Sequence, residues 1–175
     1  MMNRNAYMIA VGLLILGAGC FPVQLPDKKS ETQPDAVQPV SFKIPGVNQE
    51  LNEIDLASFK GQVVLLDFWA TWCRPCISEL PALSTLHNEL KDKGFAVIGL
   101  TLDSGTRDEV TELVSRFDLS YPAGLAGEEV QAAYGGLRAV PTKFLLDRKG
   151  AVRNKYVGVG PERQLRADIE PLLAE

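Results

Sequence analysis

The sequence has few residues that bind metals and no surplus of positive charge. It contains one histidine and three cysteines among 175 residues. A zinc site takes four ligands, usually as two close pairs, and only one close cysteine pair is present. The 18 basic side chains are outnumbered by 22 acidic ones, which gives a net charge of −4, whereas a nucleic-acid-binding protein needs a basic face. We therefore expect no bound metal, no cofactor and no nucleic-acid partner.

Long hydrophobic runs are also absent, apart from one stretch near the N-terminus. The apolar run 7–18 spans about 12 residues, fewer than the roughly 20 that a membrane-spanning helix needs. Arg4 precedes this run, and the small residues 17–19 lead directly into Cys20. A cation, a short apolar run and small residues in this order are typical of a secretory signal. We therefore predict that residues 1–19 form an export signal.

Cys20, at the expected cleavage point, makes this signal resemble those of bacterial lipoproteins, in which that cysteine is lipidated. One departure is Gly17, which stands where such signals more often carry leucine. The alternatives are an ordinary cleaved signal and an uncleaved anchor. Residues 20–40 contain four prolines among polar side chains and have little apolar surface to bury, which predicts a flexible tether. The folded domain is then expected at residues 41–175.

Strand and helix patterns alternate along residues 41–175. Two buried strands are expected at 63–69 and 95–102, because each is an almost continuous apolar run. Two further strands should form a hairpin over residues 142–157. Apolar residues at helical spacing and a capping box predict four helices. The first follows Cys76, the second begins at Thr106, the third spans 128–134 and the fourth begins at Pro161. Strands alternating with helices predict an α/β sheet with helices on both faces.

The most informative motif is the pair Cys73 and Cys76, separated by Arg74 and Pro75. The pair lies between the expected strand 63–69 and the start of a helix. Unpaired N–H groups and the helix dipole favour a thiolate at that position. Pro75 loses no needed hydrogen bond so early in a helix, and Arg74 adds a nearby cation. The alternatives are a structural disulfide and one half of a metal site.

The sequence around these cysteines resembles the thioredoxin superfamily, and within it the membrane-tethered thiol-disulfide oxidoreductases of the TlpA/ResA type. The matching stretch is Phe68-Trp-Ala-Thr-Trp-Cys-Arg-Pro-Cys-Ile-Ser-Glu-Leu-Pro81, and Val140-Pro141-Thr142 resembles the cis-proline loop of that family. The resemblance covers nearly all of residues 41–175. It implies a thioredoxin-like α/β fold, with a central mixed sheet, helices on both faces and a βα insertion before the cis-proline loop.

The resemblance also implies how the two cysteines act. Cys73 would be the exposed nucleophile that attacks a substrate disulfide, and Cys76 would be the thiol that resolves the mixed disulfide. Asp67, inside an apolar strand, should have a raised pKa because burial penalises its charge. Such a carboxylate suits a proton acceptor for Cys76. The position matches the buried aspartate of thioredoxins, whereas the TlpA type often has asparagine there. The alternative is an acid that faces solvent or is simply hydrogen-bonded.

Three more site residues follow from the resemblance. Glu79 would lie near the cysteines and influence their acidity, the alternative being a solvated helix glutamate. Trp72 would shield the disulfide and contact partners, the alternative being a core side chain. Pro141 in cis would keep metals from the thiols and let Val140 pair with an extended substrate strand, the alternative being an ordinary trans proline. His87 is expected to be a plain surface or rim histidine.

These features predict an exported, membrane-tethered reductase of protein disulfides. The resemblance implies disulfide-containing exported proteins as substrates, apocytochrome c among the candidates. It also implies a thiol-electron donor in the membrane, and attachment to that membrane through a lipid on Cys20. The competing hypotheses are a dithiol oxidant or isomerase, a thiol peroxidase, and a non-enzymatic lipoprotein adaptor or copper carrier.

Overall fold

The computed structural model describes residues 41–48, 52–102 and 106–175. The chain divides into two compact units, Met1–Glu31 and Thr32–Glu175, and every described residue belongs to the second unit. The predicted signal at 1–19, the lipidation of Cys20 and the tether at 20–40 lie outside the described residues. Among the residues that are described, no helix has both the length and the apolar character to cross a membrane.

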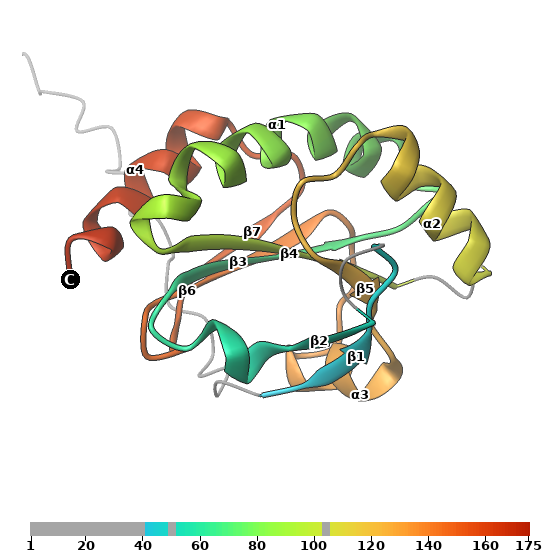
Figure 1. Cartoon of the computed structure of the whole chain (residues 1–175), viewed down its shortest axis with the longest axis horizontal. Helices are drawn as coiled ribbons and strands as arrows, with labels where there is room; N and C mark the ends of the chain where they lie inside the picture. Colours follow the sequence, from blue (N-terminus) through green and yellow to red (C-terminus); the bar gives the residue numbers. More distant parts are fainter. Residues whose placement is uncertain (1–40, 49–51, 103–105) are drawn as a thin grey trace, which may run out of the picture. The chain divides into compact units, whose positions relative to one another are not determined.

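A five-stranded mixed sheet forms the centre of the domain (Figure 1). Its strand order is β5-β4-β3-β6-β7. Strands β3, β4 and β5 are parallel, and β6 and β7 run antiparallel to their neighbours. All seven residues of β3 and all seven of β4 are buried, since both faces of the sheet are covered. The strands are β3 Val63–Trp69, β4 Phe95–Thr101, β5 Ala123–Leu125, β6 Thr142–Leu146 and β7 Val152–Val157.

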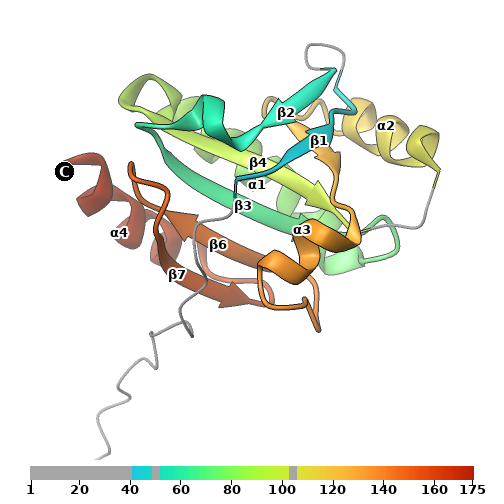
Figure 2. The same cartoon turned by 90° about the horizontal axis from the view of Figure 1, so that it is seen from below.

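Each face of the sheet carries its own apolar core. Helices α1 (Arg74–Leu90), α2 (Arg107–Arg116) and α4 (Glu162–Leu173) pack on one face. The other face is covered by α3 (Glu128–Ala133) and by a small hairpin of β1 (Lys43–Pro45) and β2 (Glu53–Asp55), as Figure 2 shows from below. Short 3-10 helices occupy Leu56–Phe59 and Lys91–Lys93. The predicted mixed α/β fold with helices on both faces is confirmed.

Local signals in the sequence explain several element boundaries. Helix α2 begins with the predicted capping box, in which Thr106 and Glu109 each bond the backbone N–H of the other. Strand β5 and helix α3 lie between α2 and β6, in the part of the chain where the βα insertion is expected. Helix α4 begins one residue later than expected, because Pro161 is its N-cap rather than its first helical residue. The β1–β2 hairpin was not predicted, since strands of three residues carry no periodic pattern.

Gly124 is where the hairpin meets the edge of the sheet. Gly46, just after β1, forms an isolated antiparallel bridge with Gly124 in β5. A Cβ atom at position 124 would lie 2.7 Å from the backbone oxygen of Pro45 and 2.8 Å from Cδ1 of Ile44. Backbone cannot move aside as a flexible side chain can. The missing side chain of Gly124 therefore allows the hairpin to dock on β5.

We expect Gly124→Ala to destabilise the domain by about 2 kcal/mol, because the added methyl group overpacks the hairpin junction. Urea unfolding followed by far-UV circular dichroism measures this change. Gly160→Ala is the matched control, since a Cβ there meets nothing within 4 Å; its unfolding free energy should stay within about 0.5 kcal/mol of wild type. Equal unfolding midpoints for the two variants would contradict this account of the junction.

Candidate active site

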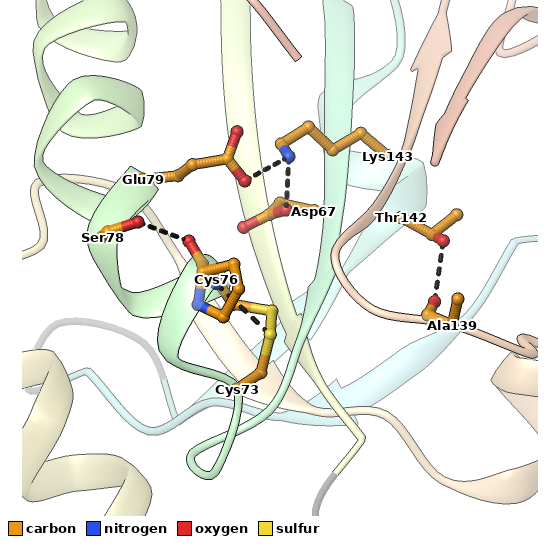
Figure 3. A network of polar contacts seen from close by, with 9 residues as sticks. Asp67, Cys73, Cys76, Ser78, Glu79, Ala139, Thr142 and Lys143 are labelled. Carbon is orange, nitrogen blue, oxygen red and sulfur yellow. Dashed lines mark hydrogen bonds and ion pairs between the residues drawn. A yellow bond between two sulfur atoms is a disulfide. The ribbon is translucent and has the colours of Figure 1, made fainter. Parts of the chain in front are cut away.

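A disulfide joins Cys73 and Cys76 at the start of α1, with an S–S distance of 2.04 Å (Figure 3). Cys73 is the N-cap of the helix, and its sulfur accepts a hydrogen bond from the backbone N–H of Cys76 at 3.3 Å. The first N–H groups of a helix have no partners inside it, and the helix dipole is positive at this end. Both effects stabilise negative charge on the Cys73 sulfur once the disulfide is reduced.

The two cysteines are more deeply buried than their neighbour Trp72. Cys76 is 1% exposed and Cys73 is 5% exposed, so the expectation of an exposed Cys73 does not hold for the disulfide form. Its sulfur turns inward, toward Cys76 and the amide groups of the helix. Trp72 is 72% exposed, which excludes the alternative of a core side chain. The exposed aromatic surface of Trp72 therefore immediately precedes the disulfide in the sequence.

The Val140–Pro141 peptide bond is cis, which excludes the alternative of a trans turn proline. Pro141 precedes β6, whose first residue Thr142 is paired with Phe68 of β3. This register brings Pro141 to the end of β3 that leads into the disulfide loop. The backbone N–H of Gly158 donates to the carbonyl oxygen of Pro141 at 2.8 Å. The flanking Val157 and Val159 are both exposed, so apolar side chains surround the cis-proline loop.

Asp67 lies in the middle of β3 and is only 2% exposed, which excludes the alternative of an acid facing solvent. Its register partner in β6 is Lys143, whose Nζ lies 3.8 Å from Oδ1 of Asp67. That separation makes an ion pair but is too long for a hydrogen bond. Burial raises the pKa of Asp67 to about 7; the charge of Lys143 counteracts part of this rise and the charge of Glu79 adds to it.

Lys143 is the site residue that the sequence analysis missed. It is 1% exposed, and its Nζ donates to Oε2 of Glu79 at 2.8 Å. Glu79 is therefore not a solvated helix residue, because its side chain is 12% exposed and bound to Lys143. One lysine thus serves two carboxylates, which come from β3 and α1 and lie above the disulfide in the view of Figure 3. The available signal was a lone lysine inside the apolar strand that follows Pro141.

His87 and Arg74 do not join this cluster of charges. Arg74 is exposed at the start of α1. His87 was expected at the surface or rim, and it is partly buried. Its Nδ1 accepts a hydrogen bond from the backbone N–H of Val97, and its ring packs edge-on against Tyr121 at 6.2 Å. His87 therefore ties α1 to β4, and burial lowers its pKa.

Comparison with known proteins places this geometry in a family. The profile of the Redoxin family matches residues 29–173. The chain belongs to the Redoxin family. Thiol-disulfide oxidoreductase ResA of Bacillus cereus (strain ATCC 10987 / NRS 248) is 33% identical over 172 residues, which are 97% of each chain. Thiol:disulfide interchange protein DsbE of Vibrio cholerae is 29% identical over 98% of this chain and 95% of its own length.

A solved structure agrees with these relatives. A secreted thiol-disulfide isomerase from Corynebacterium glutamicum has a TM-score of 0.71 and 26% identity, over 89% of this chain and 98% of that one. The chain is therefore a thiol-disulfide oxidoreductase of the TlpA/ResA type with a thioredoxin-like fold. It is an enzyme rather than an inert adaptor.

The raised pKa of Asp67 predicts a loss of stability as pH rises. The folded domain holds the Asp67 proton up to about pH 7, whereas the unfolded chain releases it near the ordinary value of 3.8. Because the folded state binds this proton more tightly, its contribution to the unfolding free energy is greatest below pH 3.8 and is lost as pH rises to 7. We expect Asp67→Asn to remove a decline on the order of 4 kcal/mol.

The measurement is urea unfolding of the oxidised protein at about pH 4 and about pH 8. Asp118→Asn is the matched control, because Asp118 is exposed and has a positive φ of 46°, which asparagine tolerates. The control should keep the pH dependence of wild type. If Asp67→Asn keeps it as well, the raised pKa of Asp67 is refuted.

Proposed function

We propose that this oxidoreductase is an exported dithiol reductase that uses Cys73 and Cys76 to reduce disulfides of other exported proteins. The main support is the arrangement of the two sulfurs at the start of α1. Cys73 is the helix N-cap and receives the Cys76 amide, whereas Cys76 lies behind it with 1% exposure. Only the Cys73 thiolate has the helix N-terminus to stabilise it.

The reaction begins with the reduced enzyme. The Cys73 thiolate attacks one sulfur of the substrate disulfide, forms a mixed disulfide and releases the other substrate sulfur as a thiolate. The Cys76 sulfur then attacks Cys73, closes the enzyme disulfide and releases the second substrate sulfur. The enzyme loses two electrons and the substrate gains them. A membrane thiol donor of the class named above would return the two electrons to the enzyme.

Asp67 is proposed to accept the Cys76 proton in the second step. A thiol must lose its proton before it attacks, and the buried Cys76 has no helix N-terminus to help it. With a pKa of about 7, Asp67 is partly ionised at neutral pH and can take up one proton there. Glu79 and Lys143 would act by positioning and charge, since Lys143 holds both carboxylates.

Substrates are proposed to dock beside Trp72 and the cis-proline loop. Trp72 offers exposed aromatic surface next to Cys73, while Val157 and Val159 add exposed apolar surface beside Pro141. An extended peptide segment could pair with the backbone of Val140, a mode in which main-chain bonds give affinity without sequence specificity. This docking suits a class of substrates that share a disulfide rather than a sequence.

The enzyme is proposed to work outside the cytoplasm, tethered to a membrane. Support comes from the signal pattern at 1–19, Cys20 and the proline-rich segment 20–40, and from the neighbour that is described as secreted. About twenty extended residues reach at most about 65 Å, which would hold domain 41–175 clear of the membrane. Its proposed partners are exported disulfide proteins, apocytochrome c among them, and a membrane thiol donor.

Variants of the two cysteines test the chemistry. Cys76→Ser should accumulate mixed disulfides with substrate, because the second step cannot occur, whereas Cys73→Ser should form none. Reduction of an insulin disulfide should fall at least 1000-fold in both variants. Non-reducing gels detect the trapped species, and turbidity measures the reduction. Ser78→Ala is the matched control, since Ser78 is an exposed serine in the same helix turn. Trapping by Cys73→Ser instead of Cys76→Ser would reverse the assigned roles.

The redox state of the enzyme in cells tests the direction of electron flow. Reduction potentials of thioredoxin-like proteins span about 150 mV, and the sign of the difference from the compartment sets the direction. Acid quenching of cells followed by thiol alkylation should show Cys73 and Cys76 mostly as dithiols. A mostly disulfide population, together with a potential near the oxidising end of that range, would establish an oxidant or isomerase instead.

Fractionation of the same cells tests the attachment of the protein to the membrane. The full chain should fractionate with membranes, and Cys20→Ser should move to the soluble fraction while the purified variant keeps its insulin-reducing activity. A Cys20→Ser chain that stays with the membranes would refute lipidation as the anchor and leave the redox assignment untouched.

A further inference from the structure

Gly99 of β4 lies beside Asp67 in the centre of the sheet. The two residues are Cα partners in the parallel register of β3 and β4. Trp69, two residues beyond Asp67 in β3, is on the same face, because side chains two apart in a strand point the same way. Tyr121, just before β5, belongs to the apolar cluster on that face. Three polar side chains therefore gather around a residue that has none.

Each of these side chains has a buried polar atom that lacks a hydrogen-bond partner among the described residues. Oδ1 of Asp67, Nε1 of Trp69 and the hydroxyl oxygen of Tyr121 make no hydrogen bond within the described part of the chain. Asp67, Trp69 and Tyr121 are 2%, 0% and 1% exposed. An unsatisfied buried polar group is costly, and such groups are normally bonded to protein or to internal water. Three of them around one residue point to a shared partner.

The side chains of Trp69 and Tyr121 both approach closely over Gly99. A Cβ atom there would lie 3.2 Å from Nε1 of Trp69 and 3.2 Å from Cε2 of Tyr121. Any residue larger than glycine at position 99 would therefore press against both side chains. A water molecule bonded to two to four polar groups is a usual component of a protein interior.

We propose that Tyr121 is a positioning residue for Asp67 and acts through one internal water bound above Gly99. The water accepts hydrogen bonds from the Tyr121 hydroxyl and from Nε1 of Trp69, and it donates one to Oδ1 of Asp67. Its donors and acceptors match the three atoms, because the tryptophan nitrogen can only donate and an ionised carboxylate can only accept. The inference rests on the proposed role of Asp67 in the reaction.

The charges around the water keep this direction of hydrogen bonding. Lys143 from β6 and Glu79 from α1 face Asp67, and His87 from α1 packs against the Tyr121 ring. Burial and the negative charges of Asp67 and Glu79 hold the pKa of Tyr121 well above its usual range. Tyr121 therefore keeps its proton at every working pH and remains a donor, so the bridge supports the ionised form of Asp67.

Tyr121→Phe removes the hydroxyl and keeps the ring. The ionised Asp67 carboxylate then loses an oriented donor, so its titration midpoint should rise by about one pH unit. At about pH 6 this makes the ionised fraction roughly tenfold smaller. The measurement is the ¹³C chemical shift of the Asp67 carboxyl carbon against pH, in the oxidised full chain, where neither Cys73 nor Cys76 titrates.

Two further variants separate this effect from packing. Tyr134→Phe removes another buried tyrosine hydroxyl, on the opposite face of the sheet, and should leave the Asp67 midpoint unchanged. Gly99→Ala fills the water position with a methyl group and should raise the midpoint as Tyr121→Phe does. In the double variant the two rises should not add, because both changes disrupt one bridge.

An Asp67 midpoint that is the same in Tyr121→Phe and wild type overturns the proposal, as does an equal rise in Tyr134→Phe. A midpoint unmoved by Gly99→Ala places the bridge elsewhere and overturns the water site. None of these readings uses turnover. A failure of insulin reduction in wild type would therefore count against the proposed function alone, and an unchanged titration against the role of Tyr121 alone.

Discussion

The site depends on a single buried lysine. Lys143 is 1% exposed and lies between two carboxylates that come from different layers of the domain, at 2.8 Å from Glu79 and 3.8 Å from Asp67. A buried charge in this position is tolerated only when it is paired. Removal of one partner strongly lowers the stability of the fold, because it leaves the other charge buried and uncompensated. Lys143 thus fixes α1 against the sheet at the point where the disulfide begins. The positive charge of Lys143 also opposes the rise in the Asp67 pKa that burial causes.

The antiparallel pairing of β6 with β3 places Lys143 opposite Asp67. Asp67 and Lys143 are register partners, and Pro141 enters the same strand two residues earlier. Strand β6 therefore carries the lysine that pairs with Asp67 and Glu79, and the cis-proline loop immediately precedes that strand. A slip of one residue in this register would turn Lys143 to the opposite face of the sheet, where it would meet the aromatic rings of Phe68 and Tyr134. The sheet register is thus a constraint on the chemistry as well as on the fold.

Local patterns in the sequence predicted those features that local forces decide. The buried runs gave β3 and β4 with bounds that agree to within one residue, and Thr106 and Glu109 marked the start of α2. Asp67 was recognised because a carboxylate inside an apolar strand must have a shifted pKa. Lys143 was missed because its role depends on pairing with a strand far away in the sequence. The contacts of His87 were not predicted for the same reason, since only the packed fold brings it to β4 and Tyr121.

In the proposed reaction, the two sulfurs and Asp67 carry the negative charge at different steps. The helix N-terminus can support one anion, and Cys73 as the N-cap occupies that position. A second thiolate on the more buried Cys76 would add a negative charge near Asp67 and Glu79, which like-charge repulsion opposes. The proposed transfer of the Cys76 proton to Asp67 would avoid this, because it would move the negative charge from one buried group to another and leave the number of buried charges unchanged. The raised pKa of Asp67 would make this proposed exchange feasible at neutral pH, since an acid with a pKa near 3.8 would not retain the proton it receives.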